Sequence, residues 1–395
     1  FSVVSSRVEV TVHVVPHSHV DPMWKFTPEE YMLRTDAILD TSIVSLLLDA
    51  KRTFVWESLY FLDLFLKTHG KKSVCGEKKH ASVHFLREKY NCFTFREAIL
   101  ELLNNGQLEL VGGGWTAHDE ALTDFYAALD NLAVGRRWVA EELGHRYNSG
   151  VAWFLDSFGH SSGTSSTLAG MGYESQVLNR VPFHIKRLVN SRGPSFFVYN
   201  SERRTESFKF VRFSSTHSNL LSTILPRHYS SPPVLGSLLE HKEVKQRDIE
   251  RAARELRGII MNDATTCPGI ARITGECPIL LLVGDDFSFR RAERSFTALE
   301  YVLQATQTLL NSERGDYRFA VQLSTPSRYF SAVKKCAAGN SDVDIFLRGQ
   351  SSAAVPTAQG HLLPYSDNEV NDWTGYYGSR PVLKHQIRDT EDLLR

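Results

Sequence analysis

The sequence lacks an apolar run long enough to cross a bilayer, since its longest run, residues 278–284, has the length of one strand. It also lacks an excess of charge, because Lys and Arg together number 45, as do Asp and Glu. These absences exclude a membrane span and a nucleic-acid or anionic-membrane partner held by bulk charge. The expected partner is small and neutral.

Cysteine motifs and glycosylation sequons are missing as well. The five cysteines show no C-x-x-C spacing, which argues against a cysteine zinc site. An odd count leaves at least one free thiol unless two chains pair, and Cys267 and Cys277 could bridge in an oxidising compartment. The absence of Asn-x-Ser/Thr argues mildly against a heavily glycosylated secreted protein. The chain opens at Phe1 without a visible signal peptide, so we expect a processed or incomplete N-terminus.

The stretch from residue 8 to residue 24 is the most informative part of the chain. Its valine-rich run predicts a buried strand that ends at Pro16, which has no N–H to donate. Just beyond lie His17, His19 and Asp21, and side chains two residues apart in extended chain point to the same side. His19 and Asp21 therefore form half of a site for a divalent metal, unless the segment is an ordinary turn.

Apolar strands and helices alternate along the rest of the chain. We expect strands over residues 53–57, 108–111, 150–155, 176–181, 195–199, 208–213, 279–283 and 317–323. We expect helices over residues 27–49, 59–67, 95–104, 123–145, 164–171, 240–261 and 292–310. The basic stretch 68–90 predicts a surface insertion, and the glycines at 112–114 predict a sharp turn or a close backbone approach. Near-continuous apolar strands indicate a parallel sheet covered on both faces, doubly wound or closed as a barrel.

Two more predicted strands end in carboxylates, Asp156 after one and Asp285 with Asp286 after the other. Because the carboxyl ends of parallel strands lie on one face, these residues should meet His19 and Asp21, although any one of them could be only a helix cap. Together they offer a histidine and two carboxylates for a metal, and the histidine favours zinc over magnesium or manganese. A second carboxylate beside a sugar is typical of a glycosidase.

Six motifs in chain order resemble the zinc-dependent retaining α-mannosidases of glycoside hydrolase family 38, especially the lysosomal branch. They are Pro16-His-Ser-His-Val-Asp-Pro22 with Trp24, Gly113-Gly-Trp115 with Asp119-Glu120, Asp156-Ser-Phe-Gly-His-Ser161, Asn179-Arg180-Val181, Gly284-Asp-Asp-Phe287 and Trp373-Thr-Gly-Tyr-Tyr-Gly-Ser-Arg-Pro381. The resemblance covers nearly the whole chain.

The resemblance implies a role for each matching residue. His19, Asp21 and Asp156 would hold one zinc ion per chain. Asp156 would also be the nucleophile, and Asp286 the general acid/base. The substrate would contact Trp24, Phe158, Arg180, Asp285 and Tyr229.

The resemblance also implies a fold and an activity. We expect a mostly parallel sheet closed or nearly closed as a seven-stranded α/β barrel with helices outside. Residues 1–330 would form the α/β catalytic domain, and 331–395 an extension leading into a helical domain that is missing here. The enzyme would be an exo-α-mannosidase of mannose metabolism and glycoprotein catabolism. It would remove terminal mannose from N-glycan-type oligosaccharides in a lysosome, a vacuole or the secretory lumen.

The chain departs from the family pattern in ways that bear on activity. Ser157 replaces a proline, and Met23 replaces a glycine. The family's fourth zinc ligand, a histidine in a His-His-Asp-Ala motif, is not present in this chain. We therefore expect weak zinc binding and little activity unless a downstream segment, a second chain, or His17 or His160 completes the site. Two alternatives stay open: a catalytically impaired, truncated mannosidase-like protein with weak mannose binding, and a metal-dependent carbohydrate deacetylase.

Overall fold

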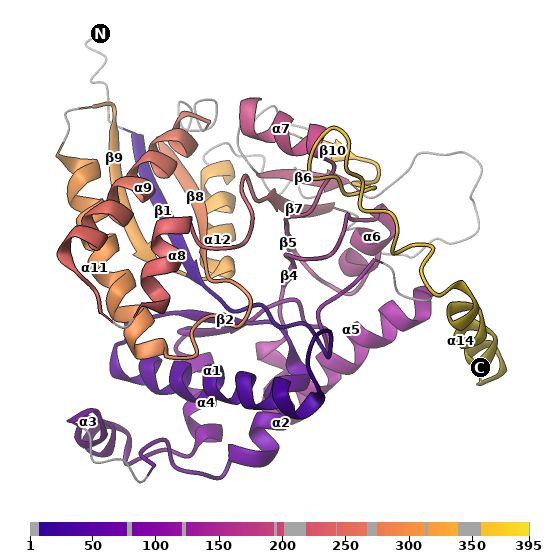
Figure 1. Ribbon diagram of the computed structural model, residues 1–395, viewed down its shortest axis with the longest axis horizontal. Helices are drawn as coiled ribbons and strands as arrows, with labels where there is room; N and C mark the ends of the chain where they lie inside the picture. Colours follow the sequence, from indigo (N-terminus) through magenta and orange to yellow (C-terminus); the bar gives the residue numbers. More distant parts are fainter. Residues whose placement is uncertain are drawn as a thin grey trace.

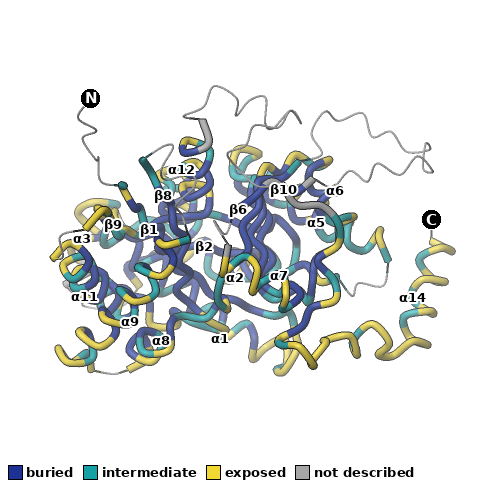
Figure 2. The backbone as a smooth tube through the Cα atoms, turned by 90° about the horizontal axis from the view of Figure 1, so that it is seen from above, coloured by how far each residue is buried: buried dark blue, intermediate teal, exposed yellow. Residues whose placement is uncertain are grey.

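The computed structural model describes residues 8–76, 81–120, 124–192, 196–200, 219–241, 243–266, 275–312, 315–338 and 357–394. Strands occupy the centre of the molecule and helices surround them (Figure 1). Most strand residues are buried, whereas the outer sides of the helices are exposed (Figure 2). No helix among the described residues is both long and apolar enough to cross a membrane.

A three-stranded parallel sheet in the order β8-β1-β9 carries the valine-rich stretch at its centre. Its strands are β1 (Val8–Pro16), β8 (Glu276–Val283) and β9 (Tyr317–Leu323). One face packs against α8 (Pro233–Glu240), α9 (Gln246–Thr265) and α11 (Ala292–Asn311). Leu280 and Leu282 on the other face pack against α12 (Pro326–Ala338). Both faces of β8 are covered, which explains its apolar run, whereas the edge strand β9 exposes Arg318, Ala320 and Gln322.

A five-stranded sheet in the order β10-β6-β7-β5-β4 forms the second part of the centre. Its strands are β4 (Val151–Phe154), β5 (Ser175–Leu178), β6 (Phe196–Asn200), β7 (Asn219–Ile224) and β10 (Thr357–Gln359). Only the β6–β7 pair is antiparallel. The helices nearest in sequence are α5 (Phe125–Val139), α6 (Ser162–Gly170) and α7 (Phe183–Arg192), with a π-turn at Ala140–Gly144 and a 3₁₀ turn at His145–Tyr147 after α5.

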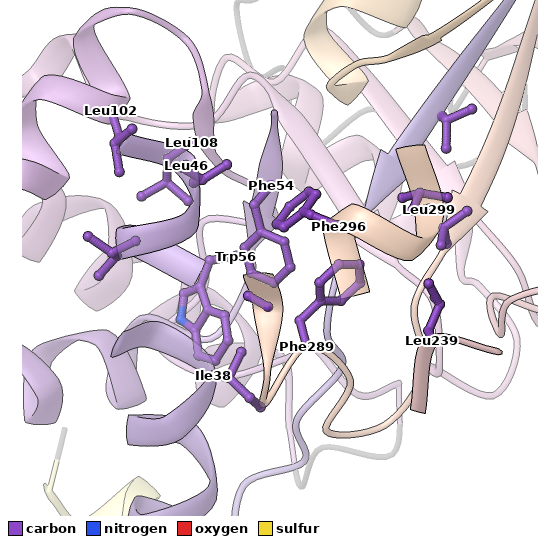
Figure 3. Packing of buried hydrophobic residues seen from close by; sticks show 14 of the residues in the cluster. Ile38, Leu46, Phe54, Trp56, Leu102, Leu108, Leu239, Phe289, Phe296 and Leu299 are labelled. Atoms are coloured by element: carbon purple, nitrogen blue, oxygen red, sulfur yellow. The ribbon is translucent and has the colours of Figure 1, made fainter. Parts of the chain in front are cut away.

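A two-stranded parallel sheet, β2 (Phe54–Trp56) with β3 (Leu108–Leu110), lies beside the carboxyl end of β1. Its helices are α1 (Pro28–Leu48), α2 (Leu59–His69) and α4 (Phe95–Asn104). Thr27 caps α1 in a capping box with Glu30, as the Thr-Pro-Glu-Glu sequence predicts. Phe54 and Trp56 pack with Phe289 and Phe296 in the largest apolar cluster (Figure 3).

The predicted seven-stranded barrel is wrong. The described strands form three separate sheets, and no pairing among them closes a ring. The five-stranded sheet ends at β10 and β4, while β8 and β9 are the edges of the three-stranded sheet. An isolated bridge between His17 and Val55 links β1 to β2. Apolar patterning predicts how many strands are buried, but strand order and the reversal of β6 depend on contacts between distant segments.

The predicted insertion at 68–90 contains a helix, α3 (Ala81–Tyr90), and a disulfide between Cys75 and Cys92 fastens it. Cys277 is also disulfide-bonded, whereas Cys267 and the predicted strand 208–213 lie outside the described residues. Cys336 is a buried free thiol.

The chain after β10 first packs against the body, with Leu362, Tyr365 and Ser366 buried, and then leaves it to end in α14 (Pro381–Leu394), none of whose residues is buried. The predicted division into 1–330 and 331–395 stays a prediction.

The predicted close approach at the three glycines is confirmed. Gly112 and Gly113 have φ of +72° and +71°, values that favour glycine. The turn presses against α5, because a Cβ on Gly135 would lie 2.3 Å from the carbonyl oxygen of Gly113. Gly135 therefore lets helix and turn touch through their backbones.

Candidate metal centre and active site

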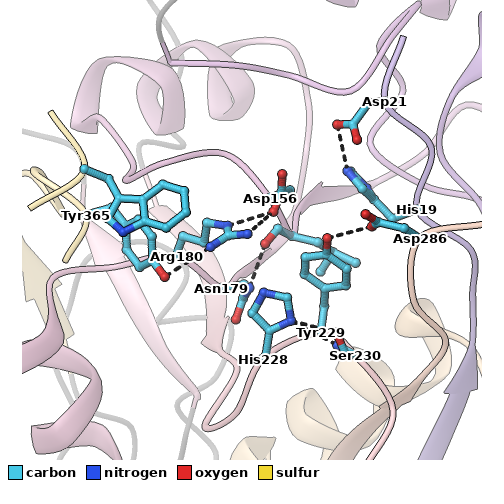
Figure 4. Close-up of polar contacts among 12 residues, drawn as sticks. His19, Asp21, Asp156, Asn179, Arg180, His228, Tyr229, Ser230, Asp286 and Tyr365 are labelled. Carbon is cyan, nitrogen blue, oxygen red and sulfur yellow. Dashed lines mark hydrogen bonds and ion pairs between the residues drawn. The ribbon is translucent and has the colours of Figure 1, made fainter. Parts of the chain in front are cut away.

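The site is built from the loops that follow β1, β4 and β8. The loops after β1 and β8 run side by side: the His19 N–H donates to the Asp285 carbonyl at 3.2 Å, and the Phe287 N–H donates to the His19 carbonyl at 3.1 Å. An isolated bridge pairs His19 with Asp286. Two predicted site segments, more than 260 residues apart in sequence, are thereby fixed beside each other. Figure 4 shows Asp156 facing them.

His19, Asp21 and Asp156 form a group that could hold a metal ion, since one ligand atom from each lies within 4.8 Å of the others. It is the one such group of three or more histidine, cysteine or acidic side chains in the part of the chain that the structure describes. Nε2 of His19 is 3.3 Å from Oδ1 of Asp21, and Nδ1 of the same ring is 3.5 Å from Oε2 of Glu57.

The donor set fits a divalent cation. His19 is buried, and three carboxylates, those of Asp21, Glu57 and Asp156, surround its ring. Burial alone would lower the pKa of His19, but its contacts with Asp21 and Glu57 raise the pKa well above its usual value. Burial raises the pKa of Glu57. The site thus concentrates negative charge around a nitrogen donor, and mixed N/O ligands of this kind suit zinc.

Asp156 sits where β4 ends, and Arg180, just after β5, holds it. Nε and Nη2 of Arg180 donate to the same oxygen, Oδ1, at 2.7 and 2.5 Å. The guanidinium also donates to the Tyr365 hydroxyl at 3.1 Å and lies 5.1–5.2 Å from the ring centres of Phe158, Tyr365 and Trp373. Arg180 is therefore fixed by an aromatic cage, and it fixes one oxygen of Asp156.

Asp286 receives a 2.8 Å hydrogen bond from the Tyr229 hydroxyl at Oδ1. Partial desolvation raises the pKa of the Asp286 carboxyl, and this hydrogen bond counteracts the rise. Asp285 instead accepts the backbone N–H of Asp286 at 2.9 Å. Desolvation of Asp286 thus favours its protonated form, as a general acid requires.

Tyr229 joins the two halves of the site. It lies in the loop after β7, is buried, and its ring centre is 5.3 Å from that of His19. Its carbonyl accepts a hydrogen bond from Nε2 of His17 at 3.0 Å. Burial raises the pKa of the Tyr229 hydroxyl, so that it stays a donor to Asp286.

Trp24 lies at the rim, with 64% of its surface exposed and the ammonium of Lys25 3.9 Å from its ring centre. The neighbouring Met23, where the family has glycine, adopts φ of +54°. At this exposure Trp24 does not belong to a core cluster. Ser157, in place of the family's proline, donates to the His118 carbonyl at 2.6 Å.

Neither His17 nor His160 joins the candidate metal group. His17 is turned toward the Tyr229 carbonyl, and His160 is buried against Phe154. Glu57, by contrast, contacts His19 and was not predicted as a site residue. The available signal was a polar residue directly after a buried strand, the pattern that also marks Asp156.

Comparison with known proteins gives one consistent result. Residues 9–74 and 77–368 match the family model described as the glycosyl hydrolases family 38 N-terminal domain. The chain is 26% identical over 409 residues to alpha-mannosidase B of Dictyostelium discoideum, covering 98% of this chain and 36% of that protein. It is 26% identical over 401 residues to bovine lysosomal alpha-mannosidase, covering 98% and 35%. The chain thus spans about a third of the length of these curated relatives.

A solved structure shares the fold. The crystal structure of an alpha-mannosidase from Enterococcus faecalis superposes with a TM-score of 0.54 over 89% of this chain and 31% of that one, at 14% identity.

Proposed function

Since this chain belongs to glycosyl hydrolase family 38, whose N-terminal domain it matches over most of its length, we propose that it is a zinc-assisted, retaining exo-α-mannosidase. Its substrate would be terminal α-linked mannose on N-glycan-type oligosaccharides. The observation that carries the proposal is the convergence of His19, Asp21 and Asp156 with a fourth group, Asp286, that has a separate hydrogen-bond partner.

The residues divide into two carboxylates with different tasks. Asp156 is the nucleophile: its carboxylate attacks the anomeric carbon, forming a glycosyl ester while the bond to the leaving oxygen breaks. Asp286 gives its proton to that oxygen. It then removes a proton from the water that hydrolyses the ester, so that mannose leaves with its configuration retained.

Zinc held by His19, Asp21 and Asp156 would supply Lewis-acid polarisation of sugar oxygens and share the charge of the transition state. Arg180 orients Asp156 through the two hydrogen bonds to Oδ1. Trp24 and Phe158 would provide apolar surface for the sugar ring, and Asp285 and Tyr229 would provide polar contacts.

Two observations support a lysosomal or secretory setting as part of the proposal. A lysosomal relative and the Cys75–Cys92 disulfide both support an oxidising lumen, where glycoprotein catabolism would supply the substrate.

Hydrolysis of an aryl α-mannoside by the purified chain, with and without added zinc, tests the proposal. For the chain alone we expect weak zinc binding and little activity. With an added downstream segment that carries a His-His-Asp motif, we expect zinc-dependent release of the aryl group, release of α-mannose as the first product, and no hydrolysis of the β-anomer. Bound zinc without turnover after the downstream segment is added would contradict the proposal and favour a mannose-binding protein. Release of acetate from an acetylated glycan would favour a deacetylase.

A further inference from the structure

Glu57 has no role in the proposed reaction, yet the fold places it beside the metal group. The isolated bridge pairs His17 with Val55 in parallel orientation. Residues two positions further along both strands are again neighbours on the same side, so Glu57 lies opposite His19. Strand register therefore explains why a carboxylate at the end of β2 meets an imidazole beyond the end of β1.

The two nitrogens of the His19 ring face different carboxylates. Nε2 lies 3.3 Å from Oδ1 of Asp21, on the side of the candidate metal group. Nδ1 lies 3.5 Å from Oε2 of Glu57, and the two side chains are only 2% and 9% exposed. A neutral imidazole carries one N–H, and whichever nitrogen bears it cannot bind a metal.

Packing holds Glu57 in this position. Gly112, at φ of +72°, leaves room for the glutamate, since a Cβ there would lie 3.3 Å from Cγ of Glu57 and 3.7 Å from Cβ of Trp153. The glycine turn predicted at 112–114 thus packs against the Glu57 side chain and leaves space for it. The carboxylate is positioned by the protein before any ligand binds.

We propose that Glu57 is a positioning residue for the metal centre: when a metal occupies Nε2 of His19, the Glu57 carboxylate, 3.5 Å from Nδ1, accepts the Nδ1–H and so directs the Nε2 lone pair toward Asp21 and Asp156. The inference rests on the proposed function, because it presupposes a metal at that group. Carboxylate partners of metal-bound histidines fix the ring tautomer, and their loss typically weakens metal binding by about 10- to 100-fold.

Zinc affinity, measured by competition with a chromogenic chelator, tests the proposal. We expect Glu57→Ala to bind zinc about 10- to 100-fold more weakly than the parent chain, at unchanged stoichiometry. Glu57→Gln should be affected less, because its amide oxygen can still accept the Nδ1–H. The matched control is Glu109→Gln on the neighbouring strand β3. It removes a carboxylate that accepts hydrogen bonds from Ser327 of α12, and it should leave zinc affinity unchanged.

Nitrogen NMR of the zinc-loaded chain gives a second readout, with the proton expected on Nδ1 of His19. If the parent chain binds zinc and Glu57→Ala binds it with the same affinity, the inference is overturned but the proposed function stands. A proton found on Nε2 of His19 has the same consequence. If Glu57→Gln loses all zinc, as His19→Ala should, then Glu57 is itself a zinc ligand, and the inference that it only positions His19 is overturned. If the parent chain binds no zinc, both the inference about Glu57 and the proposed zinc-assisted function are overturned.

Discussion

The Tyr229 hydroxyl donates a 2.8 Å hydrogen bond to Oδ1 of Asp286 and thereby favours the ionised form of that carboxyl. Desolvation acts in the opposite direction and raises the Asp286 pKa above its usual value. A general acid is active while protonated, so activity falls as the pH rises through this pKa. The hydroxyl therefore helps to set the alkaline limit of turnover.

Replacing Tyr229 by phenylalanine removes the hydrogen-bond donor that opposes the rise in the Asp286 pKa. We expect the Asp286 pKa to increase, so that the alkaline limb of kcat/KM moves to higher pH. At the optimum, kcat/KM should fall about tenfold, the equivalent of one hydrogen bond of ~1.4 kcal/mol. A pH–rate profile on an aryl α-mannoside measures both. If the alkaline limb stays in place or moves to lower pH, Asp286 is not the group whose ionisation sets that limb.

The two catalytic carboxylates should respond differently to alanine. Asp156→Ala should abolish turnover and lower zinc content, because one side chain is both nucleophile and metal ligand. Asp286→Ala should keep zinc. Its rate should fall about 10²–10⁴-fold on substrates with poor leaving groups, but much less on activated aryl mannosides. Zinc content and rates across a leaving-group series measure these effects.

Asp285→Ala is the matched control for this pair of variants. It should keep the leaving-group dependence of the parent chain, because Asp285 bonds to a backbone N–H and not to Tyr229. If Asp286→Ala lost zinc as fully as Asp156→Ala, the assignment of roles would be wrong.

Arg180 and the candidate nucleophile give a third prediction. Arg180→Lys keeps the charge but cannot make two hydrogen bonds to Oδ1 of Asp156 in the same geometry. We expect kcat to fall about 10²-fold from misplacement of the carboxylate, with zinc content unchanged. Arg187→Lys is the control, since that arginine makes an exposed ion pair with Glu369. Equal rates for both variants would exclude the positioning role.

The sequence predicted the site better than it predicted the sheet. His19, Asp21, Asp156 and Asp286 all follow buried strands, and residues at strand ends gather wherever neighbouring strands run in parallel. That argument needs only local patterning and holds for three separate sheets as well as for a barrel. Strand order does not follow from it, which is why the barrel was wrong.

Most contacts between side chains could not be predicted from the sequence. Glu57 meets His19 only because His17 pairs with Val55, and one residue of slip would point the glutamate to the other face. Cys75 and Cys92 could not be paired from sequence, because five cysteines allow many pairings. The family resemblance placed Arg180 in the pocket, but not its bonds to Asp156.

Two buried histidines under the Asp156 loop predict how stability depends on pH. His118 and His160 both lie against Phe154, with ring centres 5.1 and 5.8 Å away. None of their ring nitrogens has a hydrogen-bond partner among the described residues. Burial lowers the pKa of His118 to about 4 and that of His160 to about 3. Both are therefore neutral in the folded protein near neutral pH.

The unfolded chain binds these two protons near the ordinary histidine pKa of about 6.5, well before the folded chain does. Stability is therefore complete above pH ~6.5 and falls as the pH drops toward the folded pKa values. Between pH 7 and pH 5 each histidine should cost about 2 kcal/mol of unfolding free energy. Urea unfolding at the two pH values measures that difference.

Replacing both histidines by phenylalanine keeps a ring against Phe154 but removes the titrating groups. We expect the stability difference between pH 7 and pH 5 to shrink by about 4 kcal/mol, whatever the absolute stability of the variant. An unchanged difference in the double variant would mean that the two imidazoles already carry protons, or exchange them with bound water, in the folded protein. Their burial would then not be the source of acid lability in the loop that carries Asp156.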